Sequence, residues 1–136
     1  MARKKSIKTL FKESNSKTAH FDTYKVDKSD NIIMMNVFPG DTGQASLSEA
    51  YLEGVKIIGD HEGPIDALPV GTNKKLRGKF LDVYTLVTDI PGEPDLTSFR
   101  FQLNGGVMPY ENFMEKTVQS QGDSVVYKIS IFFTIH

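Results

Sequence analysis

The residues best suited to chemistry are gathered in one short segment. Asp60, His61 and Glu62 are consecutive, and Asp66 follows four residues later. An oxygen-rich group of this kind suits calcium better than zinc, because zinc prefers nitrogen and sulfur ligands. The spacing matches no EF-hand loop, however, and adjacent side chains rarely all turn toward one ion. We therefore expect neither a metal site nor a cofactor in this chain.

Nucleophilic catalysis has little support. The chain contains no cysteine, and its three histidines are His20, His61 and His136. A serine triad needs a histidine held between the nucleophile and a carboxylate, together with a pair of oxyanion donors. The sequence has no GxSxG turn that would present a serine. It also has no Trp for a typical sugar-stacking cleft. We expect a protein that is not an enzyme.

Charged residues are distributed unevenly along the chain, although its formal net charge is only −1. Residues 1–28 are predominantly basic, whereas residues 29–73 are predominantly acidic. Opposite charge poles favour head-to-tail association or a charged partner. The alternative is a solvated basic tail with solvated acidic loops. We expect an acidic protein surface to be contacted by Lys4, Lys5, Lys8 and Lys12. Such a surface could be supplied by Glu49, Glu53, Asp60, Glu62 and Asp66.

A second basic cluster supports nucleic-acid binding as the alternative function. It consists of Lys74, Lys75, Arg77 and Lys79, and it could form one positive stripe with the basic N-terminal residues. Single-strand binders also need aromatic platforms beside such a stripe, but the alternation of Phe80 with Tyr84 suits a core better. The pI near 6.3 also argues against a dedicated nucleic-acid binder. A sandwich that binds a small ligand or carbohydrate is a second alternative.

The strand pattern is clearest in residues 125–135, where every second residue is apolar. These residues are Val125, Tyr127, Ile129, Ile131, Phe133 and Ile135. A period of two places them on one face of a β-strand. Residues 97–103 alternate in the same way, and we expect Phe99, Phe101 and Leu103 to point inward. Residues 107–118 contain Pro109, which favours an edge strand or a bulge.

The remaining elements are predicted from local signals. We expect strands over 20–26, 32–38, 55–58 and 76–89, with the first two joined as a hairpin by the turn at 27–31. Ser46 and Glu49 match a capping box, which predicts one helix over 46–54. We expect a loop over 59–72 with a short extended piece near 65–68. Ile7, Leu10 and Phe11 are spaced for one or two helical turns, or for an arm that orders on a partner.

The sequence therefore predicts an all-β, mainly antiparallel fold. Strands separated by turn signals, with no βαβ alternation, favour a β-sandwich or jelly-roll-like domain with at most one short helix. We expect one domain over residues 19–136, preceded by a basic N-terminal arm over residues 1–18. No apolar run reaches the roughly 18 residues of a membrane span, and no secretory signal is evident. We expect a cytoplasmic protein that makes no membrane contact.

The composition also resembles that of tube-forming proteins of contractile injection systems and phage tails. Those proteins lack cysteine and a signal sequence, and they are β-rich with one helix. Residues 51–60, followed by Ile65 and Asp66, are similar to the early part of such proteins. We assign the chain to no family on this short segment. The likeness favours a non-catalytic binding or assembly module that acts through protein–protein contacts, with a protein or a second copy of the chain as partner.

Overall fold

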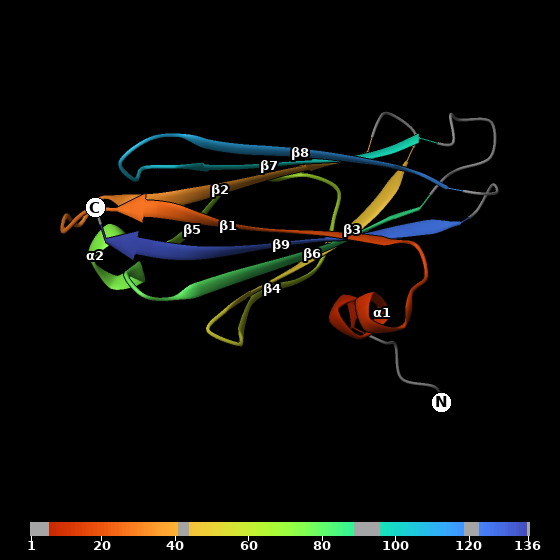
Figure 1. Cartoon of the computed structure of the whole chain (residues 1–136), viewed down its shortest axis with the longest axis horizontal. Helices are drawn as coiled ribbons and strands as arrows, with labels where there is room; N and C mark the ends of the chain where they lie inside the picture. The colour runs from red at the N-terminus through yellow and green to blue at the C-terminus, as the bar shows by residue number, and fades with distance from the viewer. Residues whose placement is uncertain (1–5, 41–43, 89–95, 119–122, 136) are drawn as a thin grey trace.

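The computed structural model describes residues 6–40, 44–88, 96–118 and 123–135, which form two facing β-sheets (Figure 1). Sheet A contains, in spatial order, β1 (Lys17–Val26), β9 (Ser124–Ile135), β6 (Phe80–Thr88), β3 (Ala45–Leu52) and β4 (Val55–Glu62). Sheet B contains β5 (Ile65–Thr72), β2 (Ile32–Pro39), β7 (Leu96–Asn104) and β8 (Tyr110–Thr117). Neighbouring strands are antiparallel except β1 and β9, which are parallel. The predicted, mainly antiparallel β-sandwich is confirmed.

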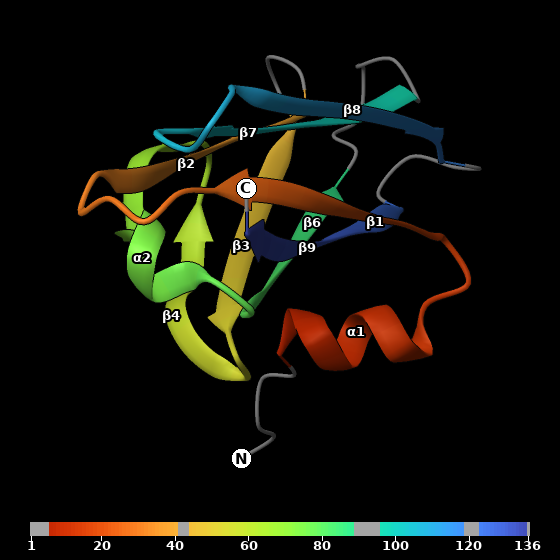
Figure 2. The ribbon, with the colours of Figure 1, turned by 60° about the vertical axis from the view of Figure 1, so that its left-hand side comes forward.

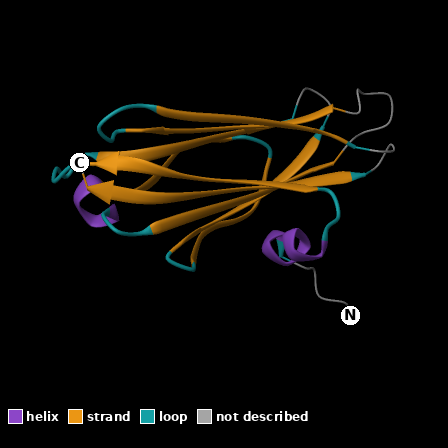
Figure 3. Ribbon diagram, in the orientation of Figure 1, coloured by secondary structure: helices purple, strands orange, loops and turns teal. Residues whose placement is uncertain are grey.

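The part of the chain that the structure describes contains two short helical segments (Figure 3). Helix α1 (Ile7–Glu13) precedes β1, and the single turn α2 (Asn73–Leu76) connects β5 to β6. The hydroxyl of Ser6 caps α1 by accepting the backbone N–H of Thr9 at 3.1 Å. The helix lies on the side of sheet A that faces away from sheet B (Figure 2). Residues 7–13 of the predicted basic arm are therefore packed against the sandwich.

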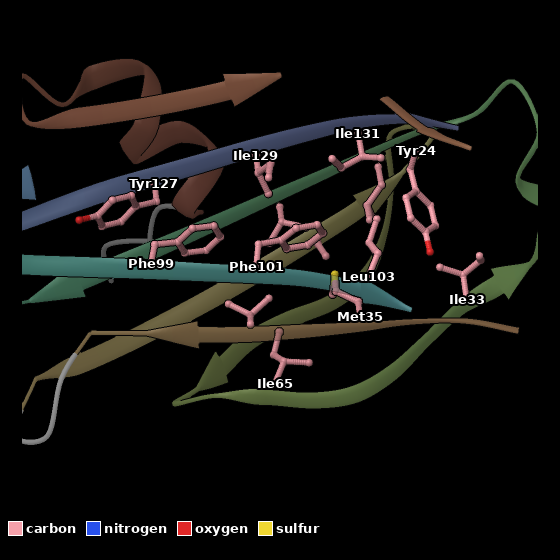
Figure 4. Close-up of a cluster of buried hydrophobic side chains, with 14 of the residues drawn as sticks. Tyr24, Ile33, Met35, Ile65, Phe99, Phe101, Leu103, Tyr127, Ile129 and Ile131 are labelled. Atoms are coloured by element: carbon pink, nitrogen blue, oxygen red, sulfur yellow. The ribbon is translucent and has the colours of Figure 1, made fainter. Parts of the chain in front are cut away.

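The hydrophobic core fills the space between the sheets (Figure 4). The inward alternation predicted for residues 97–103 is confirmed, because Phe99, Phe101 and Leu103 are fully buried on β7. The alternation predicted for the C-terminal strand also holds, except that Ile135 is exposed. The core residues of β9 are Val125, Tyr127, Ile129, Ile131 and Phe133. The only polar atom of the Tyr127 side chain lies 2.6 Å from the hydroxyl of Thr97, so this ring is buried without an unpaired hydroxyl.

The helix predicted over 46–54 is wrong. Residues 45–52 form β3, which pairs with β6 on one side and with β4 on the other. Glu49 does not close a capping box around Ser46, because its carboxylate binds the N-terminus of α1 instead. Backbone pairing along both edges outweighs the local helical signal, since isolated helices of this length are marginal in water.

The predicted hairpin of residues 20–26 with residues 32–38 is also wrong. Both segments are strands, but β1 belongs to sheet A and β2 to sheet B. The turn at 27–31 crosses from one sheet to the other, and β1 pairs in parallel with the end of the chain. The loop predicted over 59–72 consists largely of β4 and β5. Both are edge strands, where glycine and proline are tolerated. Strand β8, which follows Pro109, lies at a sheet edge as predicted.

Candidate protein-binding surface

Helix α1 covers one end of the outer face of sheet A. Two residues of α1 face the sheet. Ile7 is buried against it, and the ring of Phe11 contacts that of Tyr84 edge-on with 5.7 Å between centroids. This small cluster is separate from the main core and is completed by Leu10, Leu47, Tyr51, Leu86 and Val126. Lys8 and Lys56 lie over the ring of Tyr51, at 5.2 and 5.8 Å from its centroid. The helix therefore shields an apolar area that the sheet would otherwise expose.

Glu49 anchors the first turn of this helix. Its side chain is only 1% exposed, and its Oε1 atom accepts the backbone N–H groups of Ile7 at 2.7 Å and Lys8 at 3.2 Å. Its Oε2 atom lies 3.0 Å from Lys56 Nζ. Burial raises the pKa of the Glu49 carboxyl, but Lys56 and the two N–H groups outweigh burial and give a net lowering of this pKa. An ionised carboxylate at a helix N-terminus is also favoured by the helix dipole.

Three phenylalanines, two of them exposed and one half-buried, form a cluster on the same face, beyond the area that α1 covers. Phe21 of β1, Phe132 of β9 and Phe80 of β6 come from three adjacent strands. Phe80 lies opposite Phe132 in the register, and ring centroids are 4.7 Å apart for this pair and 6.1 Å apart for Phe21 and Phe80. Phe21 is 59% exposed and Phe80 is 40% exposed. The expectation that Phe80 lies in the core is therefore wrong. We call these three residues the aromatic patch.

The two margins of the aromatic patch differ in charge. At one margin, the backbone N–H of Phe80 is 3.4 Å from Glu53 Oε2, and Asp82 lies two residues along β6 from Phe80. The carboxylate of Asp82 accepts a hydrogen bond at 2.6 Å from the hydroxyl of Ser130, its partner in the register of β6 with β9. At the other margin, the exposed side chain of Lys25 lies on the same face of β1 as Phe21, because the two positions differ by four and side chains in a strand alternate between faces. The patch thus has an acidic side and a basic side.

The rings of the aromatic patch are tilted against one another. The angle between ring planes is 44° for Phe21 and Phe80 and 41° for Phe80 and Phe132. Nucleic-acid bases and sugar rings stack on aromatic faces that stand free to receive them. These rings instead pack against each other and form one compact apolar area. Such a surface suits the irregular packing of a protein interface.

The predicted basic partner-binding residues are divided by the structure. Lys4 and Lys5 lie outside the described residues, whereas Lys8 and Lys12 belong to α1. The second basic cluster begins in α2, at the opposite end of the sandwich from α1 (Figure 1). Its members are Lys74, Lys75, Arg77 and Lys79. Among the described residues, Lys8 and Lys12 of the first cluster are therefore separated from the second cluster by the length of the sandwich.

The predicted acidic residues also occupy different environments. Glu49 is buried and bound within the chain, so a partner cannot reach it while α1 is docked. Glu53 is exposed in the turn between β3 and β4, beside the aromatic patch. Asp60 and Glu62 are exposed on β4, at the edge of sheet A, and Asp66 is exposed on β5, at the edge of sheet B. The sequence pattern did not distinguish these positions.

The two histidines in the described residues, His20 and His61, take part in structural contacts, whereas His136 lies outside those residues. His61 Nε2 lies 2.8 Å from the carbonyl oxygen of Pro64. His20 Nε2 lies 3.4 Å from Asp22 Oδ2, which also accepts the hydroxyl of Tyr110 at 3.0 Å. Burial and the Asp22 carboxylate raise the pKa of Tyr110, so its hydroxyl stays protonated and links β8 to β1 across the sandwich. Within the described residues, no group of three or more His, Asp or Glu side chains could hold a metal ion.

Comparison with known proteins finds no matching family model, no matching curated protein and no matching solved structure. Among the described residues, no helix has the length and apolar character needed to cross a membrane.

Proposed function

We propose that this chain is a non-catalytic assembly module that associates with further copies of itself through the aromatic patch. The observation that carries this proposal is the exposure of Phe21 and Phe80 beside Phe132 on the outer face of sheet A. The solvent-facing side of an antiparallel sheet normally carries polar residues. Contiguous exposed apolar residues with a polar rim are typical of interaction surfaces, and aromatic residues often dominate their binding energy.

The charges around the aromatic patch favour a protein over a nucleic acid. Glu53 and Asp82 lie next to Phe80, where a phosphate backbone on the patch would be repelled. Of the basic residues that would contact phosphates, the described ones on α1 and those that begin in α2 lie at opposite ends of the sandwich. A protein surface can complement both signs of charge, whereas a nucleic acid presents only one.

The proposal includes that the protein is not an enzyme. Two carboxylates with partners in distant segments hold elements of the fold together: Glu49 holds α1, and Asp22 links β1 to β8. We also place the module in the cytoplasm, since a chain without cysteine suits a reducing compartment.

Size-exclusion chromatography with light scattering tests this proposal directly. We expect a mass above the 15.2 kDa of one chain, rising with protein concentration. The chain has five Tyr and no Trp, so co-purifying nucleic acid would strongly raise the ratio of absorbance at 260 nm to that at 280 nm. A mass of one chain at every concentration would contradict self-association. An association that depends on bound nucleic acid would favour the alternative function.

A further inference from the structure

The aromatic patch is bordered by a basic residue on one side and by acidic residues on the other. Lys25 is exposed at the β1 margin, whereas Glu53 and Asp82 lie at the β6 margin. Phe132 lies between them on β9, the strand that β1 and β6 flank. A surface with an apolar centre and opposite charges on its two sides is complementary to a copy of itself turned by 180°.

We propose that two copies of the chain pack their aromatic patches together about a two-fold axis that passes close to Phe132, roughly along β9. This inference rests on the proposed function and specifies the geometry of the association. The rotation places Lys25 opposite the partner's Glu53 and Glu53 opposite the partner's Lys25. The phenylalanines of both copies fill the centre of the contact and are removed from water.

Helix α1 limits where the two copies can meet. It stands on the same face of sheet A, over the first half of β9, where Lys128 Nζ lies 5.6 Å from the centroid of the Phe11 ring. Phe132 of the aromatic patch lies in the second half of β9, where it pairs with Thr23 of β1 and Phe80 of β6. The contact therefore forms at the end of sheet A that α1 leaves uncovered. In the proposed dimer, the sheet A of one copy diverges from that of the other toward the end where each copy carries its α1.

A two-fold contact uses the same surface on both copies, so association stops at two chains. The head-to-tail arrangement expected from the charge poles would instead join different surfaces and continue into a ring or a filament. The aromatic patch needs no second surface, because both charges border it. The expected particle is thus a closed dimer with twice the 15.2 kDa mass of one chain.

Charge reversal tests this geometry. Lys25→Glu alone places two acids together at both margins, and Glu53→Lys alone places two lysines together. We expect each variant to weaken dimerisation about tenfold or more, measured by sedimentation equilibrium. An equimolar mixture of the two variants should regain the wild-type dissociation constant, and so should the double variant, because every contact again joins opposite charges. Glu115→Lys, an exposed reversal on β8, is the matched control and should have no effect.

The outcomes separate this inference from the proposed function. A dimer that tolerates both single reversals would overturn the two-fold pairing of Lys25 with Glu53, while self-association would stand. Particles that grow beyond two chains with concentration would also overturn it. A wild-type chain that is monomeric at all concentrations would overturn both claims. Weakened single variants that the mixture fails to rescue would show that the two residues do not face each other.

Discussion

Oε1 of Glu49 accepts the backbone N–H of Ile7 at 2.7 Å, which joins residues 42 positions apart in the sequence. A buried acid of a central strand thereby holds the first turn of α1 against sheet A. The same carboxylate binds the N–H of Lys8 and the ammonium of Lys56. The docking of α1 therefore combines the apolar contacts of Ile7 and Phe11 with one charged group, and Glu49 can be changed without altering the main core.

Replacement of Glu49 by glutamine should loosen α1. The variant keeps an acceptor of similar size but loses the charge that binds Lys56 and the helix N-terminus. We expect a loss of about 1–3 kcal/mol in the free energy of unfolding, because hydrogen bonds to charged groups contribute amounts of this order. Urea denaturation measures the loss, and faster amide exchange in residues 7–13 would locate it. Glu115→Gln, at an exposed position on β8 far from the aromatic patch, is the control, with an expected change below about 0.5 kcal/mol. Equal effects would refute the anchoring role.

Stability should fall in acid partly through Glu49. Its folded-state pKa lies below its ordinary value of 4.5, so the folded protein binds fewer protons than the unfolded chain as this group titrates. The stabilisation is fully present above pH 4.5 and is lost as the pH falls through the lower, folded-state pKa. We expect the free energy of unfolding to fall more steeply below pH 4.5 in the wild type than in Glu49→Gln. Parallel pH profiles for the two proteins would contradict this assignment.

Gly105 should not tolerate a side chain. It has a φ of +102°, and a Cβ added there would collide with the carbonyl oxygen of Ile32. Gly54 also has a positive φ, of +78°, but a Cβ there would meet nothing within 4 Å. We expect Gly54→Ala to cost about 1 kcal/mol from backbone strain alone, and Gly105→Ala to cost about 1–3 kcal/mol more from the collision. Thermal denaturation of both variants measures the difference. Similar melting temperatures would show that the hairpin after β7 relaxes easily.

The elements that could be predicted from the sequence are those with strong local patterns. The alternations over 97–103 and 125–135 predicted β7 and β9 correctly, because a strand covered on one face needs a residue period of two. The spacing of Ile7, Leu10 and Phe11 likewise indicated the turns of α1. Each of these elements is indicated by the spacing of residues within a single short segment.

The elements that could not be predicted depend on contacts between distant segments. The capping-box signal of Ser46 and Glu49 was real, but two neighbouring strands pair with this segment and Glu49 serves another helix. The parallel pairing of β1 with β9 joins nearly opposite ends of the chain and leaves no local trace.

The aromatic patch was only partly visible in the sequence. Phe132 stands at an outward position of the terminal alternation, and this parity could have marked it as exposed. Its proximity to Phe21 and Phe80, however, follows from the long-range registers of β9 with β1 and β6. No pattern within a single strand could bring the three rings together.

The central claim is that the aromatic patch drives self-association, and a comparison of two phenylalanine variants tests it most directly. Phe21 of sheet A and Phe113 of sheet B are both exposed on edge strands, so their replacement by serine should affect folding similarly. By sedimentation equilibrium, we expect Phe21→Ser to weaken association about tenfold or more, since buried aromatic residues dominate interfaces. Phe113→Ser should leave it unchanged. Equal dissociation constants for the two variants would contradict the account.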